Sequence, residues 1–352
     1  MARYWVGGAS TTEWNKVDGG TTTNWGTASA TRDNAAVPTS GDDVIFDNAF
    51  SGNCNISATA NVQTITFNGG TGYTGTLSGN STLTTNADGD FVFSTGMTQN
   101  WTGSLSIKFA TTAFNIYANG KSFGSNISFN NNSLIYLQQD LVCLGQLDVP
   151  STYTTRFDAK GHNASFTKIG FSSSSGTINF GNGNFTLTTS GTIFNADAAS
   201  TVNILSGTNI IVIDTSASTK TFKGGNKTYA GLSFTGKGGN LIVTGTNNLG
   251  VLKSDTSGGA NTIALPPTVT TTITSTNLNG SSGKLCNLVS STPGTAAVLS
   301  DSSGTNLVTY TNVTDVNATG GATFNYDANS TITTSTGWTA LPTGNNNFML
   351  FF

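Results

Sequence analysis

Apolar and polar residues alternate in short tracts along this chain, and no helical periodicity accompanies them. Alternation at every second residue places side chains on opposite faces of a strand, whereas an amphipathic helix repeats about every 3.6 residues. Clusters of glycine and asparagine separate the tracts, and these residues tolerate the positive φ of tight turns. The sequence therefore predicts an all-β fold with strands of about four to six residues. The clearest tracts are Phe91–Phe93, Leu105–Phe109, Ile127–Phe129, Thr177–Phe180 and Phe185–Leu187.

Apolar residues in the middle of the chain also recur at gaps of 19 or 20 residues. A repeat of this length is typical of solenoids, in which each coil buries its apolar face against the next. We therefore expect a right-handed parallel β-helix of roughly 15 coils, with tandem β-sandwiches as the alternative. The residues that make up this ladder are Ile107, Ile127, Leu147, Phe166, Phe185 and Leu205.

The scarcity of charge favours the same architecture. Only 9% of the residues are charged, against about 25% in an average soluble domain. Equivalent positions on stacked coils lie about 4.8 Å apart, where two like charges repel by roughly 0.9 kcal/mol even in water. Ladders of threonine, serine and asparagine avoid this repulsion and can hydrogen-bond along the stack. The composition is therefore typical of a stacked coil.

Three regions differ in composition. Residues 1–50 contain three of the five tryptophans, the only glutamate (Glu13) and an acidic cluster. We interpret them as a small β module for capping or attachment, because the first coil of a solenoid needs a cover. Residues 51–340 are the predicted solenoid, and residues 341–352 are an apolar tail. Within that tail the candidates for oligomer or attachment contacts are Phe348, Leu350, Phe351 and Phe352.

Several function classes are disfavoured. The 14 lysines and arginines are scattered among 17 acidic residues, so no basic stripe is available for nucleic acid. Apolar runs such as Ile210–Ile213 are much shorter than the ~18 residues of a membrane-spanning helix. The three cysteines, Cys54, Cys143 and Cys286, have no metal-binding spacing. We expect them to be buried thiols, and we expect no metal and no cofactor.

Catalytic residue types are also rare. His162 is the single histidine and has no convincing serine and aspartate partners in the sequence, so a Ser–His–Asp triad is not arguable. Asp42 and Asp43 are adjacent and would point to opposite faces of a strand. Arg156 and Asp158 would share one face of a strand, and a surface ion pair accounts for them. We therefore assign no catalytic residues.

The tryptophans are candidates for carbohydrate binding, because a flat ring can stack on a sugar. The competing interpretation is that they close the ends of the core, since tryptophan carries a large apolar area. The candidates are Trp5, Trp14, Trp25 and Trp101.

Three low-complexity segments carry a distinctive pattern. Residues Thr221–Leu232 read TFKGGNKTYAGL, and Leu241–Asn247 read LIVTGTN. Near the end, Gly283–Thr295 read GKLCNLVSSTPGT. With the opening residues Tyr4–Gly8, these segments resemble β-helix-like structural proteins of tailed bacteriophage virions, which share the pattern with some bacterial surface proteins. The resemblance implies a fibre or appendage, or a capsid decoration protein, and it brings no catalytic residues.

From this resemblance we expect a non-enzymatic virion rod that forms a homotrimer. Its partners would be other virion proteins, with a host surface glycan as a further candidate. No export signal is visible in Met1–Trp5, so we expect release inside the virion by lysis. Two alternatives remain: a tailspike that cleaves or binds carbohydrate, and a cellular surface adhesin or sheath subunit.

Overall fold

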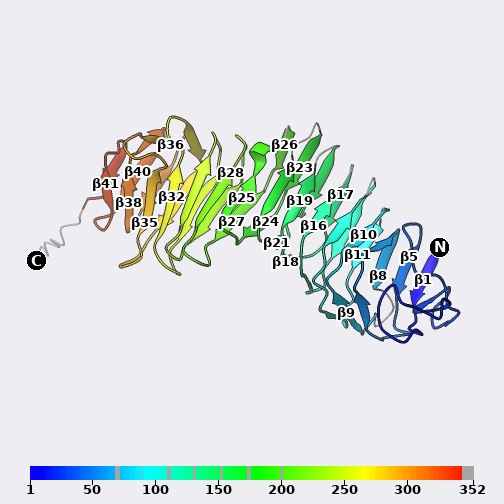
Figure 1. Ribbon diagram of the computed structural model, residues 1–352. Helices are drawn as coiled ribbons and strands as arrows, with labels where there is room; N and C mark the ends of the chain where they lie inside the picture. The colour runs from blue at the N-terminus through cyan, green and yellow to red at the C-terminus, as the bar shows by residue number, and fades with distance from the viewer. Residues whose placement is uncertain are drawn as a thin grey trace, which may run out of the picture. The chain divides into compact units, whose positions relative to one another are not determined.

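The chain folds into a β-solenoid of about 12 stacked parallel coils. The computed structural model describes residues 1–67, 72–87, 89–108, 112–129, 132–150, 154–172, 176–198 and 201–342. Within these residues the single helical element is one 3-10 turn, η1 (Ala196–Ala198). The all-β prediction and the solenoid prediction are confirmed (Figure 1).

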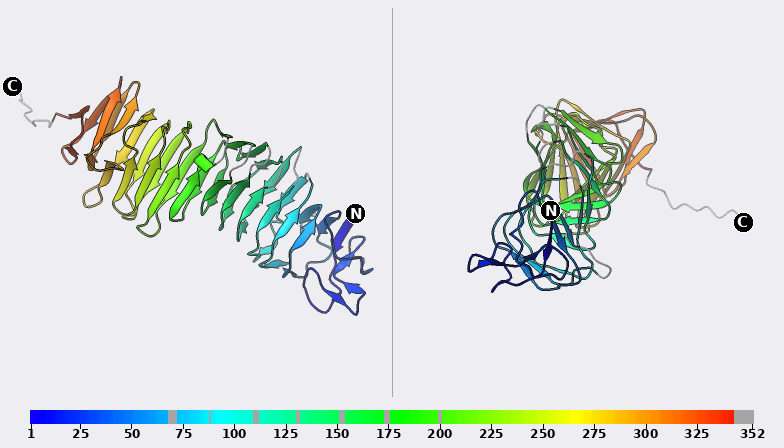
Figure 2. Two further views of the ribbon diagram at one scale, coloured as in Figure 1. Left: turned by 45° about the horizontal axis from the view of Figure 1, so that its top comes forward. Right: turned by 90° about the vertical axis from the view of Figure 1, so that its right-hand side faces the viewer.

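Two compact units make up the chain. Unit 1 comprises Met1–Thr189 and Ile193–Ile210, and unit 2 comprises Ser190–Thr192 and Ile211–Phe352. Residues 1–50 belong to the same compact unit as the coils that follow them. The left view of Figure 2 shows the strands of each unit stacked as successive coils.

Unit 1 has three strands per coil, and the strands of its coils pair in parallel with strands of the neighbouring coils, whereas β4 pairs antiparallel with β1. Sheet 1 contains β4 (Trp25–Gly26), β1 (Ala2–Trp5), β5 (Asp43–Phe46), β8 (Thr64–Phe67), β11 (Gly89–Val92), β14 (Phe114–Tyr117), β17 (Leu134–Leu137), β20 (Thr155–Asp158), β23 (Thr177–Gly181) and β26 (Thr201–Leu205). Sheet 2 contains β7 (Ala60–Val62), β10 (Leu83–Thr85), β13 (Leu105–Ile107), β16 (Ile127–Phe129), β19 (Leu147–Pro150), β22 (Ile169–Ser172) and β25 (Gly191–Asn195).

The third side of unit 1 consists of two shorter sheets. The first contains β6 (Cys54–Ile56), β9 (Thr76–Gly79) and β12 (Thr98–Gln99). The second contains β15 (Ser122–Phe123), β18 (Leu141–Cys143), β21 (Asn163–Phe166) and β24 (Asn184–Leu187), and β27 (Asn209–Ile213) lies at the sequence boundary between the units. A separate hairpin joins β2 (Val17–Asp18) and β3 (Thr22–Thr23).

Unit 2 begins with two strands per coil and then changes to three. Its main sheet contains β28 (Thr219–Lys223), β30 (Asn240–Thr244), β32 (Asn261–Leu265), β35 (Cys286–Ser290), β38 (Thr311–Thr314) and β41 (Thr331–Thr333). The other sides are formed by β29 (Gly231–Thr235), β31 (Val251–Asp255) and β34 (Ser275–Asn279), by β33 (Thr270–Ile273), β36 (Ala297–Asp301) and β39 (Val316–Gly320), and by β37 (Thr305–Val308), β40 (Thr323–Tyr326) and β42 (Trp338–Ala340).

Each unit stacks apolar residues in register along its interior. In sheet 1, Phe114, Ile135, Phe157 and Phe180 occupy equivalent positions on successive coils and are at most 2% exposed. The rings of Phe157 and Phe180 stack 5.8 Å apart. In unit 2 the corresponding ladder is Leu241, Ile263, Leu288 and Val313, all fully buried. Burial of these columns is the main source of stability, because every coil removes the apolar face of its neighbour from water.

The predicted 20-residue ladder is correct at one step and wrong at the others. Ile127 and Leu147 do pair between β16 and β19, but Ile107 pairs with Phe129 rather than with Ile127. Phe166 and Phe185 lie on the third side of unit 1, and Leu205 lies in sheet 1. The register column through Leu83, Leu105, Ile127, Leu147 and Ile169 has spacings of 22, 22, 20 and 22 residues. Turns of variable length make the coils longer than expected, so the chain has about 12 coils rather than 15.

Candidate functional site

The tryptophans that we considered for sugar stacking are core residues. Trp5, Trp14, Trp25 and Trp101 are 1%, 2%, 0% and 0% exposed. No ring face is open to solvent, so the prediction that these rings form stacking platforms is wrong. Burial wins because an indole ring removes more apolar area from water than any other side chain.

Three of these rings close the end of unit 1. Trp25 packs edge-on against Trp14 and Trp5, with ring centroids 4.7 and 5.2 Å apart, and against Phe46 at 6.0 Å. The indole N–H of Trp25 donates to the carbonyl of Trp14 at 2.8 Å. Strand β1 extends sheet 1 beside β5, and β4 then pairs antiparallel with β1. These residues therefore form a cap that covers the first coil; we refer to residues 1–46 as the cap.

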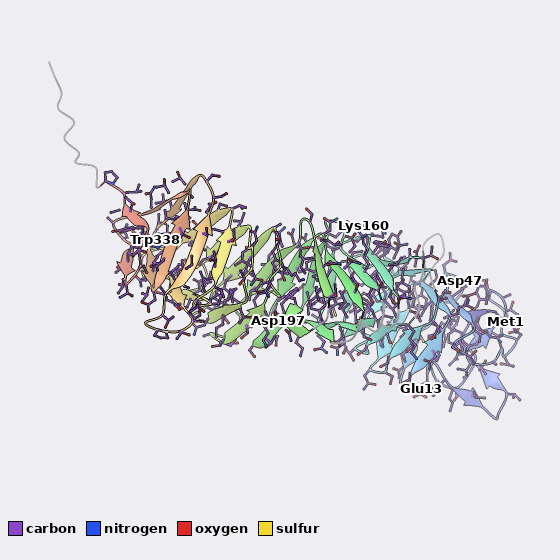
Figure 3. The ribbon with its side chains drawn as sticks, turned by 90° about the horizontal axis from the view of Figure 1, so that it is seen from above. Met1, Glu13, Asp47, Lys160, Asp197 and Trp338 are labelled. Atoms are coloured by element: carbon purple, nitrogen blue, oxygen red, sulfur yellow. The ribbon has the colours of Figure 1, made fainter. Side chains whose placement is uncertain are left out.

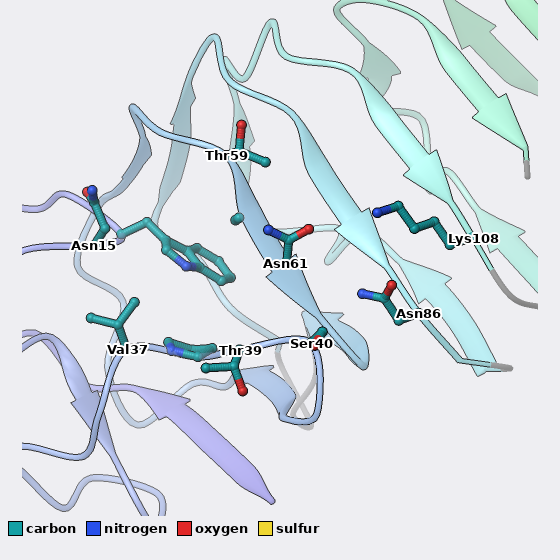
Figure 4. Close-up of a pocket in the computed structure, with 11 residues that line it drawn as sticks. Asn15, Val37, Thr39, Ser40, Thr59, Asn61, Asn86 and Lys108 are labelled. Carbon is teal, nitrogen blue, oxygen red and sulfur yellow. The ribbon is translucent and has the colours of Figure 1, made fainter.

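A cleft of about 500 Å³ lies between the cap and the first coils, and we call it the cap cleft. Figure 4 shows residues of the cap on one side and residues of sheet 2 on the other. The cap contributes Trp14, Asn15, Val37, Pro38, Thr39 and Ser40, and the coils contribute Thr59, Ala60, Asn61, Asn86 and Lys108.

Asp42 holds the cap wall of the cleft. Its Oδ2 accepts hydrogen bonds from the backbone N–H and the hydroxyl of Thr39, both at 2.9 Å. Its Oδ1 lies 3.5 Å from Arg3 Nε and 3.5 Å from the N-terminal ammonium group. Burial alone would raise the pKa of Asp42, but the Thr39 hydrogen bonds and the two positive charges outweigh it and hold the pKa below its usual value.

The coil wall comes from three consecutive coils, and two of its residues, Asn86 and Lys108, occupy one repeated position. The residue after β7, β10 or β13 is Gln63, Asn86 or Lys108, so equivalent residues are 23 and 22 positions apart. The Asn86 N–H donates to the Gln63 carbonyl at 3.1 Å, and the Asn86 side-chain amide donates to the Val62 carbonyl at 2.8 Å. In Figure 4 the ammonium end of Lys108 points toward Asn61, with Asn86 beside it. Hydrogen bonds between the backbones of adjacent coils therefore fix the Cα positions from which these side chains extend.

The lining is polar and carries little charge. Among the described residues that line the cap cleft there are three carboxamides, three hydroxyl groups and one ammonium group, and no carboxylate. Trp14, Pro38 and Ala60 are buried and form an apolar floor. This combination can bind a polar ligand by hydrogen bonds, but it has no acid or base pair for hydrolysis. Register between coils assembles the site, which is why reasoning from sequence alone missed Asn61, Asn86 and Lys108.

The outer surface of unit 1 carries hydrogen-bonded amide ladders. Asn163 donates to Asp140 at 2.9 Å, Asn184 donates to Asn163 at 2.9 Å, and Asn209 donates to Asn184 at 3.0 Å. A second ladder runs from Gln138 through Asn115 to Asp90, with bonds of 2.6 and 2.7 Å. Each ladder begins at an aspartate, which can only accept, and every amide donates toward it. The predicted hydrogen-bonding ladders of uncharged side chains are thus present.

Titratable groups on the surface form pairs rather than catalytic clusters. Arg156 contacts Asp158 at 2.6 Å, so the predicted ion pair is present, but the Asp158 side chain is only 5% exposed and the pair is half-buried rather than a surface pair. His162 Nδ1 lies 3.6 Å from Asp140. Hydrogen bonds from Asn163 hold the pKa of Asp140 below its usual value, and His162 adds to this effect. Lys160 and Asp197 lie apart on the outside of unit 1 (Figure 3). Within the described part of the chain, no three His, Cys, Asp or Glu side chains gather as metal ligands.

One buried ion pair was not foreseen. Asp214 and Lys220 in unit 2 are 3.3 Å apart, and both side chains are fully buried. Asp214 also accepts backbone N–H bonds from Ser218 and Lys237 at 3.2 Å, and Lys220 donates to Ser218 at 2.9 Å. Each charge is therefore paired and hydrogen-bonded, which offsets the cost of removing it from water.

Cys54, Cys143 and Cys286 are free and buried, as expected. Phe348, Leu350, Phe351 and Phe352 lie outside the described residues. No helix among the residues that the structure describes is long and apolar enough to cross a membrane.

Comparison with protein-family models, curated proteins and solved structures finds no match for this chain. The fold and the cap cleft therefore rest on the chain's own geometry.

Proposed function

We propose that the chain is a non-enzymatic structural component of a tailed-phage virion, acting as a stiff β-rod in a fibre, an appendage or a capsid decoration. The observation that carries the proposal is the pairing of fully buried apolar ladders inside the coils with uncharged amide ladders outside them. Such coils bend and open only by breaking a whole row of contacts with a neighbour. The segments that resemble virion proteins supply the assignment to a phage particle.

A structural role also agrees with the distribution of carboxylates. Glycoside hydrolysis usually needs two carboxyl groups on either side of the scissile bond. Among the described residues, Asp90 and Asp140 accept ladder amides, and Asp42 holds the Thr39 loop. These carboxylates are occupied by structural hydrogen bonds, which favours a rod over a depolymerase.

In this proposal three copies assemble through apolar surface on the coils. Val142 and Leu144 in unit 1 are 47% and 63% exposed and lie two residues apart. A second copy would remove this apolar surface from water, and closed symmetry is the norm for homo-oligomers. Sedimentation equilibrium should give three times the chain mass, and a Val142→Ser/Leu144→Ser variant should shift the mass toward the monomer. A monomeric wild-type protein would contradict the trimer.

Immunogold labelling tests the virion assignment. Antibodies raised against the folded chain should label phage particles in a lysate of the source culture, at the tail or over the capsid. Mass spectrometry of the purified particles should detect peptides from both units. Labelling of cell surfaces or shed filaments, with particles unlabelled, would overturn the phage assignment in favour of a surface adhesin.

A further inference from the structure

The surface of unit 2 has a pocket of about 460 Å³ where strands of its main sheet begin, and we call it the Tyr310 pocket. Ala260, Leu285 and Tyr310 line it and lie directly before β32, β35 and β38. These strands pair in register, so the three residues occupy one position on three successive coils. The carbonyl groups of Leu285 and Tyr310 each accept a backbone N–H bond of 3.2 Å from the preceding coil. Pairing between coils therefore fixes the base of the pocket.

The base is apolar and accessible to solvent. Ala260, Leu285 and Tyr310 are each half-buried, whereas the residue that follows each of them is buried in the core. Ligand sites are commonly lined by apolar and aromatic side chains with a few polar groups around them, and volumes of about 300–1,000 Å³ are usual. The Tyr310 pocket therefore offers apolar contact area that a ligand can reach.

Tyr310 has no structural partner for the polar end of its side chain. Among the described residues its hydroxyl makes no hydrogen bond and its ring makes no aromatic contact. In the buried tyrosines Tyr73 and Tyr229, by contrast, the hydroxyl donates to a backbone carbonyl at 2.6 and 2.7 Å. Tyr310 also has a φ of 48°, which is uncommon for a bulky residue. Residues held in such conformations cluster at ligand sites, and this ring is available to a ligand.

A turn over residues 281–284 forms one rim of the pocket. Ser281 and Lys284 exchange backbone hydrogen bonds of 3.0 and 2.9 Å across it. The Lys284 ammonium group donates to the Ser257 carbonyl at 2.6 Å, which ties this turn to the turn after β31. Ser282 and Gly283 lie at its tip and are exposed. The Ser282 hydroxyl is therefore presented at the rim by a turn that is anchored at its base.

Two carboxamides complete the lining. Asn287 donates to the Asn261 carbonyl at 3.1 Å and accepts from Asn312 at 3.0 Å, so it is a fixed wall. Asn329 is exposed and donates to Asp327 at 3.0 Å. A carboxamide has two N–H groups and an oxygen with two lone pairs, so Asn329 keeps one donor and its acceptor for a ligand.

We propose that the Tyr310 pocket binds an uncharged saccharide, with one sugar ring stacked on Tyr310 and its hydroxyls bound by Ser282 and Asn329. A sugar ring has an apolar C–H face and hydroxyls at its edge, which match an aromatic face with polar groups beside it. The described lining has no charged side chain, and the neighbouring Lys284 and Asp327 are already hydrogen-bonded. The pocket therefore favours a neutral ligand. This inference concerns unit 2 alone and does not depend on whether the chain belongs to a virion.

Saturation-transfer NMR with three uncharged tetrasaccharides tests the proposal on the full chain. The probes are cellotetraose, maltotetraose and the N-acetylated chitotetraose. At least one should receive saturation from the protein at the C–H protons of a sugar ring, and isothermal titration should give a millimolar or tighter Kd for it. Absence of binding for all three probes at millimolar concentration would overturn the proposal.

Substitutions at one position separate stacking from folding. Tyr310→Asn should lower the affinity about tenfold, the usual scale for truncating an anchoring aromatic ring, and asparagine tolerates the left-handed backbone. Tyr310→Phe keeps the ring and should retain most of the affinity. Tyr326→Asn, at a half-buried tyrosine of unit 2 outside the pocket, is the matched control and should bind like wild type.

The rim is tested separately. Ser282→Ala should weaken binding about threefold, as for the loss of one neutral hydrogen bond. Circular dichroism and Tm should show that every variant is folded. Wild-type affinity in Tyr310→Asn, or an equal loss in folded Tyr326→Asn, would show that the sugar does not stack on Tyr310 and would overturn the proposal.

Discussion

Single residues set how closely successive coils approach. A Cβ built on Gly103 would overlap the carbonyl oxygen of Ser81 and the indole nitrogen of Trp101. That nitrogen donates to the same carbonyl at 2.9 Å, so the glycine leaves room for a hydrogen bond between neighbouring coils. A Cβ built on Gly41, in the cap loop, would have no atom within 4 Å. The same residue type therefore has a packing role at one position and none at the other.

We expect Gly103→Ala to destabilise unit 1 by about 1–3 kcal/mol, the usual effect of overpacking. Gly41→Ala is the control and should stay within about 0.5 kcal/mol of wild type, because its new methyl group meets nothing. Urea denaturation followed by tryptophan fluorescence measures both. Equal midpoints for the two variants would show that coil spacing is looser than the structure indicates.

Asp42 should make the cap sensitive to acid. Its pKa is lower in the folded state than in an unfolded chain, so its contribution to stability is present above the unfolded pKa of about 4. That contribution disappears as the pH falls through the folded pKa, when Asp42 takes up a proton.

The measurement is Tm as a function of pH for wild type and Asp42→Asn. The variant should have the lower Tm at pH 7, and the difference should shrink as the pH falls below 4. Asp197→Asn, at an exposed carboxylate, is the control and should follow wild type throughout. A difference between wild type and Asp42→Asn that stays constant with pH would contradict the role of the carboxylate charge.

At the scale of strands and coils, the amide ladders have a direction. Asn184 donates to Asn163 and accepts from Asn209, so it needs both halves of its carboxamide. Asp140 can lie at the end of the ladder because it only accepts a hydrogen bond from Asn163 and does not need to donate one. A carboxylate at position 184 has no N–H group, so it could not donate a hydrogen bond to the Asn163 side-chain oxygen.

We therefore expect Asn184→Asp to lower the free energy of unfolding by about 0.5–1 kcal/mol at pH 7, the usual net contribution of one hydrogen bond. Protonation restores a donor, so the loss should decrease at pH 3. Asn80→Asp, at an exposed turn, is the matched control and should be near neutral at both pH values. A loss in Asn184→Asp that is the same at pH 3 and pH 7 would argue against a directional ladder.

The cap is the element that closes sheet 1. Trp25 contacts Trp5, Trp14 and Phe46 and is fully buried. Trp25→Ala should cost about 3–5 kcal/mol, because it leaves a large cavity and removes the bond to the Trp14 carbonyl. Trp338→Ala, at a half-buried ring in unit 2, should cost less. Thermal unfolding monitored by circular dichroism compares them, and an equal or smaller effect for Trp25 would mean that the cap is not a packed part of the core.

Strands could be predicted from this sequence, but register could not. Alternation locates Ile127–Phe129 and Phe185–Leu187 as strands, since period two is a local property. Pairing depends on coil length, which varies with the turns. A ladder drawn at a constant spacing of about 20 residues therefore leaves sheet 2 after Leu147, whose true partner on the next coil is Ile169. The cap cleft was missed for the same reason, because Asn61, Asn86 and Lys108 converge only through register. The tryptophans were misjudged because residue type alone does not tell which rings the cap will cover.

At the scale of the molecule, the scarcity of charge and the solenoid explain each other. Outward positions recur on every coil, so a charge at one position meets its equivalent about 4.8 Å away. Asparagine, threonine and serine fill those positions, and the structure connects them by hydrogen bonds instead. Stability then adds up from contacts between adjacent coils, with a cap over the end of sheet 1. These properties suit a protein whose work is mechanical.

Electron cryo-microscopy of phage particles purified from the source culture tests the central claim most directly. The account predicts density at the tail or capsid with strands stacked in parallel at about 4.8 Å, arranged around a threefold axis and closed at one end by the tryptophan cap. Density for antiparallel sandwiches, or particles in which the chain is absent, would contradict it.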